Sequence, residues 1–134
     1  MSQKNITIGI VSDSKVLLLK RGGTAPWQPH KYCFVGGGVD SGETLVNAAI
    51  RETNEETNIS LCENNLQPIT TYRNNKPSLF FTYYFKDRPC VQLNYEHSEY
   101  VWLSYEECID YYKRKLLVPY LIVKLNSLHS LGII

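Results

Sequence analysis

Glutamates crowd one short stretch of this chain, between Gly37 and Ile59. Glu55 and Glu56 follow Glu52 by three and four residues, so on a helix the three side chains emerge from one edge and repel one another. A divalent cation would neutralise that edge, and carboxylate oxygens are the ligands that Mg²⁺ and Mn²⁺ prefer. Taken alone, such a run of charge is more often a solvated helix face. The surrounding residues must decide between a metal site and an acidic surface.

The helix that would carry these glutamates is predicted over residues 44–57. An apolar stripe along it includes Ala48 and Ala49, whose small side chains suit close packing on a sheet. Asn58 tolerates the left-handed conformation in which helices commonly end, so we expect the helix to end there. Before the helix, the three glycines 36–38 predict a tight turn of the backbone and a close approach to a ligand.

Strand patterns on both sides of this helix predict a layered domain. The expected elements are a hairpin over 6–11 and 15–20, a loop over 21–31, strands over 32–35, 67–72, 79–85 and 100–103, a helix capped by Ser104, and a final helix over 116–128. The strand over 79–85 is apolar on both alternating faces, as expected of a central strand covered on two sides. The predicted class is therefore a mixed α and β domain, α/β (α+β), with helices on both faces of a sheet. We expect the final helix to dock onto the sheet rather than form a dimer face.

Composition narrows the class of protein. With 134 residues the chain has the size of one compact domain that buries its own core. A net charge of +1 indicates neither a polyanionic partner nor a membrane surface, and the basic cluster 113–115 is typical of a solvated helix face. The four cysteines lack zinc-ligand spacing and read as reduced thiols. We see no signal-peptide core and no membrane-spanning run, so we expect a cytoplasmic protein.

The glutamates belong to a longer pattern of fixed spacing. A glycine is followed after five residues by a glutamate and, after seven more, by Arg-Glu-x-x-Glu-Glu, which resembles the Nudix box of the MutT/Nudix hydrolases. The matching positions are Gly37, Glu43, Arg51, Glu52, Glu55, Glu56 and Ile59. Thr53 stands in place of a hydrophobic residue and Asn58 in place of the second glycine. Thr53 keeps a methyl group for packing and Asn58 can adopt the same backbone turn, so both departures are tolerable.

The flanking segments extend the resemblance over most of the chain. Residues 17–21, 32–37 and 96–103 are similar to the segments that surround the box in that family. Val35 stands where many relatives carry proline, and Tyr32 where they often carry tryptophan. The resemblance implies a single Nudix domain over 1–134, folded as an α-β-α sandwich with a mixed central sheet.

The resemblance also implies roles for particular residues. It implies that Glu52, Glu55 and Glu56 coordinate the metal, together with the carbonyl of Gly37 and a glutamate of a later loop. Glu96 is the preferred choice for that later ligand because of its distance from Trp102, and Glu99 is the second choice. Glu52 is the expected general base, although the loop glutamate takes this task in some relatives. Arg51 and Glu43 are expected to form an ion pair that orients Glu52.

Substrate contacts are less specific in the sequence. Arg21 ends a predicted strand and is a candidate for binding a substrate phosphate. An ordinary surface position without a substrate role is an equally good interpretation of this arginine. The aromatic candidates for stacking on a nucleobase are Trp27, Tyr32, Phe34, Tyr72, Phe81 and Tyr83. Most strand aromatics are core residues, so each of these has a structural role as its main alternative.

The implied activity is hydrolysis of the pyrophosphate bond in a nucleoside diphosphate linked to another group, with Mg²⁺ or Mn²⁺ as cofactor. The favoured substrate is a (deoxy)nucleoside triphosphate such as 8-oxo-dGTP, cleaved to monophosphate and pyrophosphate. Alternatives are an RNA 5′-pyrophosphohydrolase and a hydrolase of dinucleoside polyphosphates or nucleotide sugars. A catalytically silent nucleotide-binding module is a further alternative, which the intact carboxylate cluster disfavours. We expect a nucleotide as partner, no strong nucleic-acid interaction, no membrane, and a monomer or homodimer.

Overall fold

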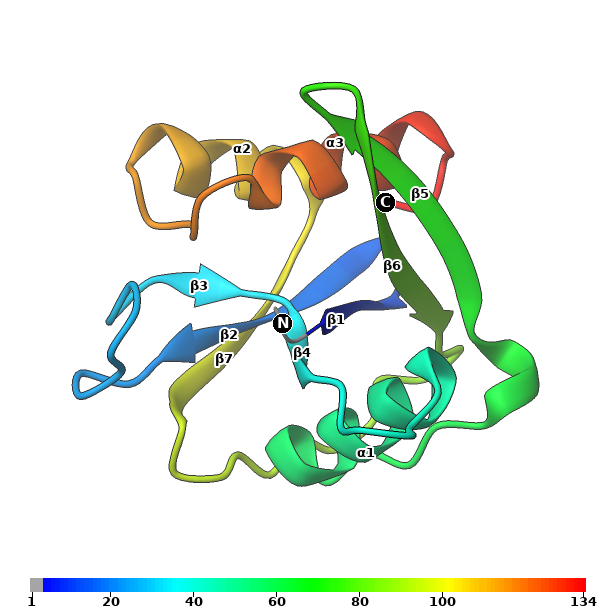
Figure 1. Ribbon diagram of the computed structural model, residues 1–134. Coiled ribbons are helices and arrows are strands. Elements are labelled where there is room, and N and C mark those ends of the chain that lie inside the picture. Colours follow the sequence, from blue (N-terminus) through cyan, green and yellow to red (C-terminus); the bar gives the residue numbers. More distant parts are fainter. Residues whose placement is uncertain (1–3) are drawn as a thin grey trace.

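The computed structural model describes residues 4–134 and contains a twisted sheet with helices on both sides (Figure 1). Its elements in chain order are β1 Asn5–Ser12, β2 Lys15–Arg21, β3 Tyr32–Cys33, β4 Val35–Gly38, α1 Leu45–Thr57, the short 3₁₀ helix η1 Glu63–Asn65, β5 Gln67–Arg73, β6 Lys76–Tyr84, β7 His97–Leu103, α2 Tyr105–Lys113 and α3 Leu121–Ser130. None of the helices in this described part has the length and hydrophobicity that crossing a membrane requires.

The sheet is mixed, as the resemblance implied. Its strand order is β3-β2-β1-β6-β5, with β4 paired to β1 and β7 paired to β2. Only the pairing of β1 with β6 is parallel among the strand pairs of the described chain. β1 and β2 share just two registered pairs near their turn, Val11 with Val16 and Ser12 with Lys15. The two strands therefore diverge, and β4 pairs with the first half of β1.

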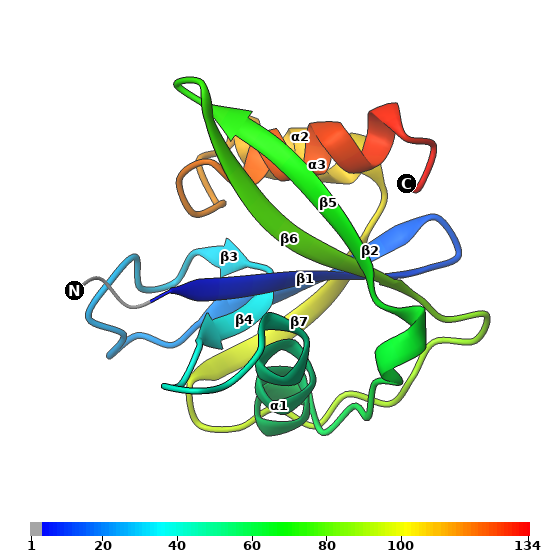
Figure 2. The same ribbon diagram turned by 45° about the vertical axis from the view of Figure 1, so that its right-hand side comes forward.

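Alternation along the strands builds a separate core on each face of the sheet. On β2, Leu17 and Leu19 pack with α1, whereas Val16 and Leu18 pack with α2 and α3. Phe80 and Phe81 of β6 divide between the two cores in the same way, so the predicted two-sided burial of this strand is confirmed. α1 lies across the sheet from α2 and α3 (Figure 2). The predicted α-β-α sandwich is thus confirmed.

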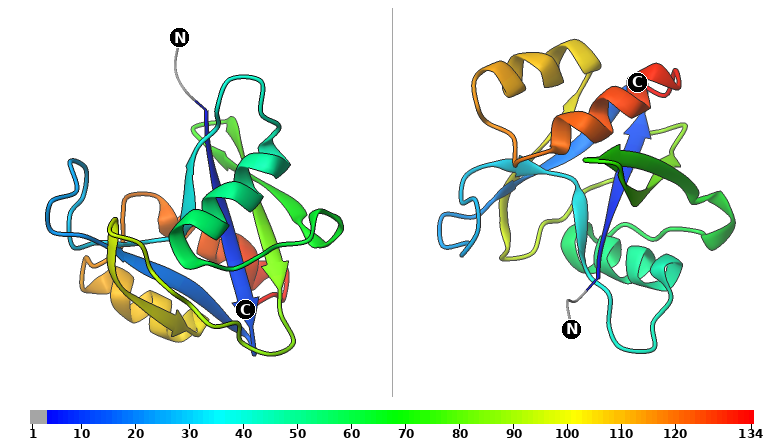
Figure 3. Two further views of the ribbon diagram at one scale, coloured as in Figure 1. Left: turned by 90° about the horizontal axis from the view of Figure 1, so that it is seen from below. Right: turned by 45° about the horizontal axis from the view of Figure 1, so that its top comes forward.

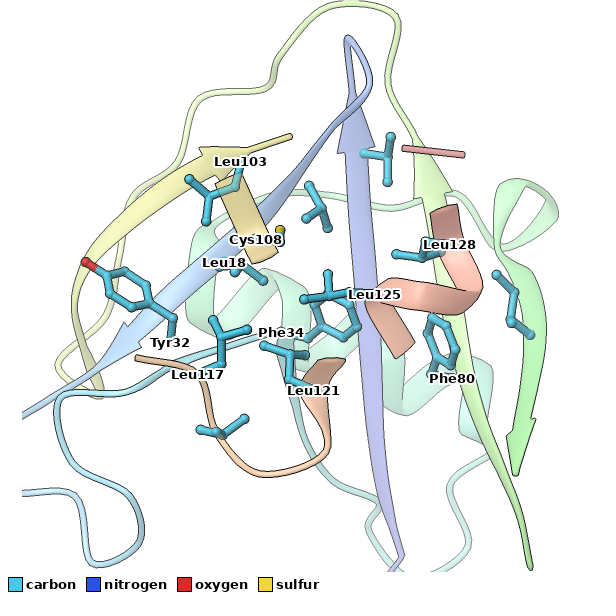
Figure 4. Packing of buried hydrophobic residues seen from close by; sticks show 14 residues of the cluster. Leu18, Tyr32, Phe34, Phe80, Leu103, Cys108, Leu117, Leu121, Leu125 and Leu128 are labelled. Carbon is cyan, nitrogen blue, oxygen red and sulfur yellow. The ribbon is translucent and has the colours of Figure 1, made fainter. Parts of the chain in front are cut away.

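The last helix begins later than predicted. α3 starts at Leu121, and residues 116–118 instead run beside β3, where the Tyr32 N–H donates to the Leu116 carbonyl and the Val118 N–H donates to the Tyr32 carbonyl. Pro119 disfavours helical backbone in the residue before it, which ends any helix that would start at 116. Its predicted docking is confirmed, because Leu121, Leu125 and Leu128 of α3 pack into the core (Figure 4).

The glycine run does not turn, which corrects the predicted tight turn. Residues 36–38 lie in β4, and none of the three has a positive φ. They are needed for close packing instead. A Cβ on Gly36 would lie 2.2 Å from the Ile6 carbonyl oxygen, and one on Gly37 would lie 2.4 Å from the Glu52 carboxyl carbon. Residue 37 must therefore lack a side chain so that the Glu52 carboxylate can lie over β4.

Candidate active site

Helix α1 has well-defined ends that hold the glutamates in position. The Thr44 hydroxyl caps its start by accepting a hydrogen bond from the Asn47 N–H, and Asn58 ends it in the left-handed conformation with a φ of 60°. Ala48, Ala49 and Thr53 are buried on the side that faces the sheet. β4 leads directly into the loop before α1, so strand and helix lie close together (Figure 3). The predicted helix and both of its predicted ends are confirmed.

Arg51 joins the loop before α1 to the glutamates on it. Its guanidinium donates two hydrogen bonds to Glu43, of 2.8 and 2.9 Å, and one of 2.8 Å to the Gly38 carbonyl. Another nitrogen donates to Glu52 at 2.9 Å and lies 3.3 Å from a Glu55 oxygen. The hydrogen bonds from Arg51 hold the pKa of Glu43 at about 2. The predicted Glu43–Arg51 ion pair is confirmed, and the same arginine reaches Glu52.

Glu52 and Glu56 face β4 from neighbouring turns of the helix. The Glu52 carboxylate lies directly over Gly37, and its burial raises its pKa. Glu56 is only 3% exposed and accepts a hydrogen bond of 2.9 Å from the Gly36 N–H. Burial raises the pKa of Glu56 to about 8, and the nearby Glu52 and Glu96 carboxylates add to the effect. Negative charge is therefore costly at this spot unless a cation approaches it.

The remaining glutamates lie at the rim. The Glu55 side chain is 54% exposed and points toward Arg51. Glu96 precedes β7, where Asn94 accepts its backbone N–H, and it lines a cavity together with Gly37 and Glu56. Glu99 lies further along β7, accepts a hydrogen bond from the Tyr32 hydroxyl, and is not part of that cavity wall. The structure brings Glu96, rather than Glu99, to the carboxylate cluster.

The cavity has a volume of about 400 Å³ and extends from these carboxylates toward α3. Its wall includes Arg21, Trp27 and Phe34 among the residues predicted to contact substrate. Arg21 donates to the Trp27 carbonyl at 2.7 Å and lies over the Trp27 ring, which keeps the guanidinium at the carboxylate end of the cavity. A cavity of this size, charged at one end and aromatic along its wall, suits a small phosphorylated molecule.

The other predicted stacking residues lie elsewhere. Phe81 and Tyr83 are buried in the core beneath α1, and the Tyr83 hydroxyl accepts a hydrogen bond from the Cys62 N–H. Tyr32 is buried against Tyr111 on the α2 and α3 side (Figure 4). Tyr72 is exposed on β5. The prediction that these four side chains contact substrate is corrected, because none of them lines the cavity and three of them fill the core.

Sequence reasoning missed a histidine and a cysteine in the wall of the site. His97 is buried, its Nε2 lies 3.8 Å from the Cys33 sulfur, and its Nδ1 lies 4.0 Å from a Glu56 oxygen. Burial and the nearby Arg21 lower the pKa of His97 to about 4, so the ring is neutral at pH 7. Its position next to Glu96 in the sequence was the available signal, but nothing in the pattern showed that its ring turns inward.

The donor set suits a hard divalent cation. The side chains around Gly37 offer carboxylate oxygens, and burial makes their charge unfavourable without a counter-ion. Within residues 4–134, no three acidic, histidine or cysteine side chains already converge in a metal-binding arrangement. The Arg51 guanidinium contacts oxygens of both Glu52 and Glu55. The residues fit such a cation in chemistry, because Glu52, Glu55, Glu56 and Glu96 all offer carboxylate oxygens.

Comparison with known proteins identifies the family. Residues 2–120 match the family model described as the NUDIX domain. The chain belongs to the Nudix family. Its relatives are pyrophosphohydrolases that act on phosphoric anhydrides, and the Nudix chain described here is an enzyme of this kind. Nudix hydrolases generally use divalent cations such as Mg²⁺ or Mn²⁺.

Individual relatives agree with this assignment. The Nudix chain is 28% identical over 127 residues to the nucleoside triphosphatase NudI of Escherichia coli, covering 83% of this chain and 89% of the relative. The crystal structure of a Caenorhabditis elegans Ap4A hydrolase binary complex has a TM-score of 0.62 and 30% identity, over 83% of this chain and 89% of that one.

A third structure shows the shared fold alone. It is a bifunctional NMN adenylyltransferase/ADP ribose pyrophosphatase of Francisella tularensis complexed with AMP and a Mn ion. Its TM-score is 0.78 at 18% identity, over 97% of this chain and 42% of that one.

Proposed function

We propose that this Nudix enzyme hydrolyses a nucleoside triphosphate to the monophosphate and pyrophosphate. The observation that carries the proposal is the single cavity that joins Gly37, Glu56 and Glu96 to an aromatic wall. Its volume of about 400 Å³ is in the range of small-molecule sites and suits one nucleotide. The similarity to a nucleoside triphosphatase over most of both chains supports the same substrate class.

In the proposed reaction a water oxygen bonds to phosphorus, the anhydride P–O bond breaks, and pyrophosphate leaves with the bridging oxygen. Glu52 accepts the proton of the attacking water. Two observations support this role: burial raises the pKa of Glu52, which makes its carboxylate a better base, and the Arg51 hydrogen bond fixes its orientation. Glu43 acts through Arg51 by holding the guanidinium in place.

The phosphates would be held by the residues around the carboxylates. Glu52, Glu55, Glu56, Glu96 and the Gly37 carbonyl are the proposed donors to Mg²⁺ or Mn²⁺. When bound, such a cation neutralises phosphate charge and makes the attacking water more acidic. Arg21 is the proposed phosphate contact, since its guanidinium lies at the same end of the cavity. 8-Oxo-dGTP is the proposed example of a damaged nucleotide among the substrates.

A second candidate substrate is a dinucleoside polyphosphate. The similarity to the nematode Ap4A hydrolase, at 30% identity, favours it. Such a substrate carries two nucleosides, and the described cavity of about 400 Å³ suits one of them. The second nucleoside would have to lie outside the cavity, for example in the adjoining hollow lined by Trp27 and Tyr120. We therefore rank this substrate below a nucleoside triphosphate.

The test is a substrate panel with Mg²⁺, with Mn²⁺ and with EDTA. The panel contains the common ribo- and deoxynucleoside triphosphates, 8-oxo-dGTP, Ap4A, ADP-ribose, a nucleotide sugar and RNA with a 5′-triphosphate. We expect metal-dependent release of pyrophosphate from at least one triphosphate, with Glu56→Gln as the inactive control. Turnover in EDTA, or a preference for Ap4A over every triphosphate, would reject the proposal.

A further inference from the structure

The cavity also holds a lysine that the proposed chemistry does not use. Lys124 lies on the first turns of α3 and lines the same cavity as Glu56 and Glu96, together with Asn5 and Thr7 of β1. Its ammonium donates one hydrogen bond of 2.9 Å to the Thr7 hydroxyl and lies 5.7 Å from the centre of the Phe80 ring. Two of its three N–H donors have no protein acceptor among the hydrogen bonds of residues 4–134.

Burial of this amine is unfavourable without a partner. Lys124 takes part in none of the ion pairs found in the described chain, and burial alone lowers its pKa. A buried amine with unused donors is stabilised by an acceptor that a ligand supplies. The sequence places no carboxylate on α3, so the acceptor does not come from the same helix.

The position of Lys124 separates it from the phosphate end. An adjoining hollow is lined by Lys124, Trp27, Tyr120 and a second cation, Arg73, and by no acidic side chain. Arg21 instead adjoins Glu96 and His97 in another small hollow. Arg21 thus shares a hollow with Glu96, whereas Lys124 does not, and phosphates gathered near Arg21 and the carboxylates would leave Lys124 to the other part of the nucleotide.

The walls beside Lys124 suit a flat ring. Trp27 and Tyr120 both line the cavity and are 51% and 53% exposed. One face of each ring is covered by an arginine, with the Arg21 guanidinium 5.3 Å from the centre of the Trp27 ring and the Arg73 guanidinium 3.3 Å from the centre of the Tyr120 ring, so a ligand would stack on the other face. Tyr120 has a φ of 69°, an uncommon left-handed conformation for a bulky residue. Such strain is typical of residues that a functional site holds in place. Aromatic faces next to an unused donor form the type of wall that binds a nucleobase.

We propose that Lys124 selects the nucleobase by donating a hydrogen bond to an oxo group on its ring. Among purines, guanine and hypoxanthine carry an acceptor oxygen at position 6, whereas adenine carries an amino group that cannot accept a hydrogen bond from the ammonium. The enzyme therefore prefers 6-oxopurines to adenine. This inference rests on the proposed nucleotide substrate and adds the identity of the base.

The test compares four purine deoxynucleoside triphosphates that differ at positions 2 and 6. dGTP and dITP carry the 6-oxo group, whereas dATP and the 2-aminopurine nucleotide lack it. We expect kcat/KM for the first pair to exceed that for the second by about 10- to 100-fold, which corresponds to one hydrogen bond to a charged donor. Lys124→Met should remove this ratio by slowing the 6-oxo pair alone. Lys113→Met on the exposed face of α2 is the matched control and should change neither pair.

Binding of dGMP, dIMP and dAMP by calorimetry separates this inference from the proposed reaction. Monophosphate binding that prefers the 6-oxo bases and loses the preference in Lys124→Met supports the base site even if no triphosphate is hydrolysed. Equal losses on all four triphosphates would mean that Lys124 binds phosphate, and would overturn the proposal. Preference for dATP in the wild-type enzyme, or no binding of any monophosphate, would overturn it as well.

Discussion

At the residue scale, the two inward-facing glutamates have different surroundings, so substituting them should affect kcat and metal affinity differently. Glu52 is hydrogen-bonded to Arg51, whereas Glu56 is held by the Gly36 N–H. We expect Glu52→Gln to lower kcat by about 10²–10⁴-fold, the range for loss of a general base, and to weaken metal affinity less than it lowers kcat, because the other proposed donors remain. Glu56→Gln should weaken metal affinity as well as kcat. Mn²⁺ titration and steady-state kinetics measure both, and an unchanged kcat in Glu52→Gln would remove it as the base.

Glu96 and Glu99 are the two candidates for the metal ligand outside α1, and their positions differ. Glu96 adjoins the cavity, while Glu99 pairs with the Tyr32 hydroxyl outside it. We expect Glu96→Gln to lower kcat/KM by about 10- to 100-fold, as loss of a group that holds the metal does. Glu99→Gln, the matched control, should change kcat/KM less than about threefold. A larger loss at Glu99 would reverse the assignment.

The lowered pKa of Lys124 predicts how the free energy of unfolding depends on pH. Its pKa is lower in the folded protein than in the unfolded chain, so between the two values the unfolded chain binds the additional proton and stability rises with pH. The penalty is therefore greatest at neutral pH, where the amine is charged in both states. We expect Lys124→Met to raise the free energy of unfolding by about 1 kcal/mol at pH 7 and by less above pH 10. Urea denaturation at both pH values measures this, and equal gains would contradict it.

The sequence predicted the arrangement of Arg51 and its glutamates better than the positions of the aromatic residues proposed to contact substrate. Fixed spacing identified Glu43, Arg51 and Glu52, because their mutual geometry follows from one helix and the loop before it. The spacing of the aromatic residues does not fix their positions relative to the site in this way. Alternation along β6 shows that Phe81 and Tyr83 share a face, but not that α1 covers that face. Lys124 was missed because its role depends on contacts between β1 and α3, which are distant in the sequence.

At the element scale, the contact between β4 and α1 sets the geometry of the site. A Cβ on Gly37 would lie 2.4 to 2.6 Å from the three carboxyl atoms of Glu52. Gly37→Ala should therefore push Glu52 away and lower kcat by about 10²-fold, since small displacements of reacting groups are costly. The flexible side chain can move, so the melting temperature should change little. Gly36→Ala is the comparison, because its Cβ would meet the Ile6 carbonyl and should destabilise the fold.

Elements with local signals were predicted, and those fixed by distant contacts were not. Helix α1 was predicted from its apolar stripe and from the end signal in Asn58, and the structure adds Thr44 as its N-cap. The segment 116–118 has a helix-like apolar pattern, but its backbone pairs with Tyr32 instead. Likewise, the glycines of β4 pair with β1 as a strand, although glycine runs favour turns. Tertiary contacts override local preference in both cases.

At the scale of the whole molecule, the site lies where the two halves of the sandwich meet. α1 brings the carboxylates from one face of the sheet, and α3 brings Lys124 from the other, while the cavity passes between β1, β4 and the start of α3. The proposed catalytic chemistry and the proposed base contact thus depend on separate cores. Substitutions in the core beneath α3 should alter substrate choice, and those beneath α1 should alter turnover.

The same arrangement predicts that metal binding stabilises the entire fold. A cation that binds the folded enzyme and not the unfolded chain adds about 2.7 kcal/mol of stability at a concentration 100 times its Kd. For a chain of 134 residues this corresponds to a rise in melting temperature of roughly 5–15 °C. We expect Mn²⁺ to produce this rise in the wild type and in Lys113→Met, with one cooperative transition in each. Glu56→Gln should lose most of the rise, because Glu56 is the most buried of the proposed ligands. An equal rise in Glu56→Gln, measured by calorimetry over a Mn²⁺ series, would locate the bound cation away from α1.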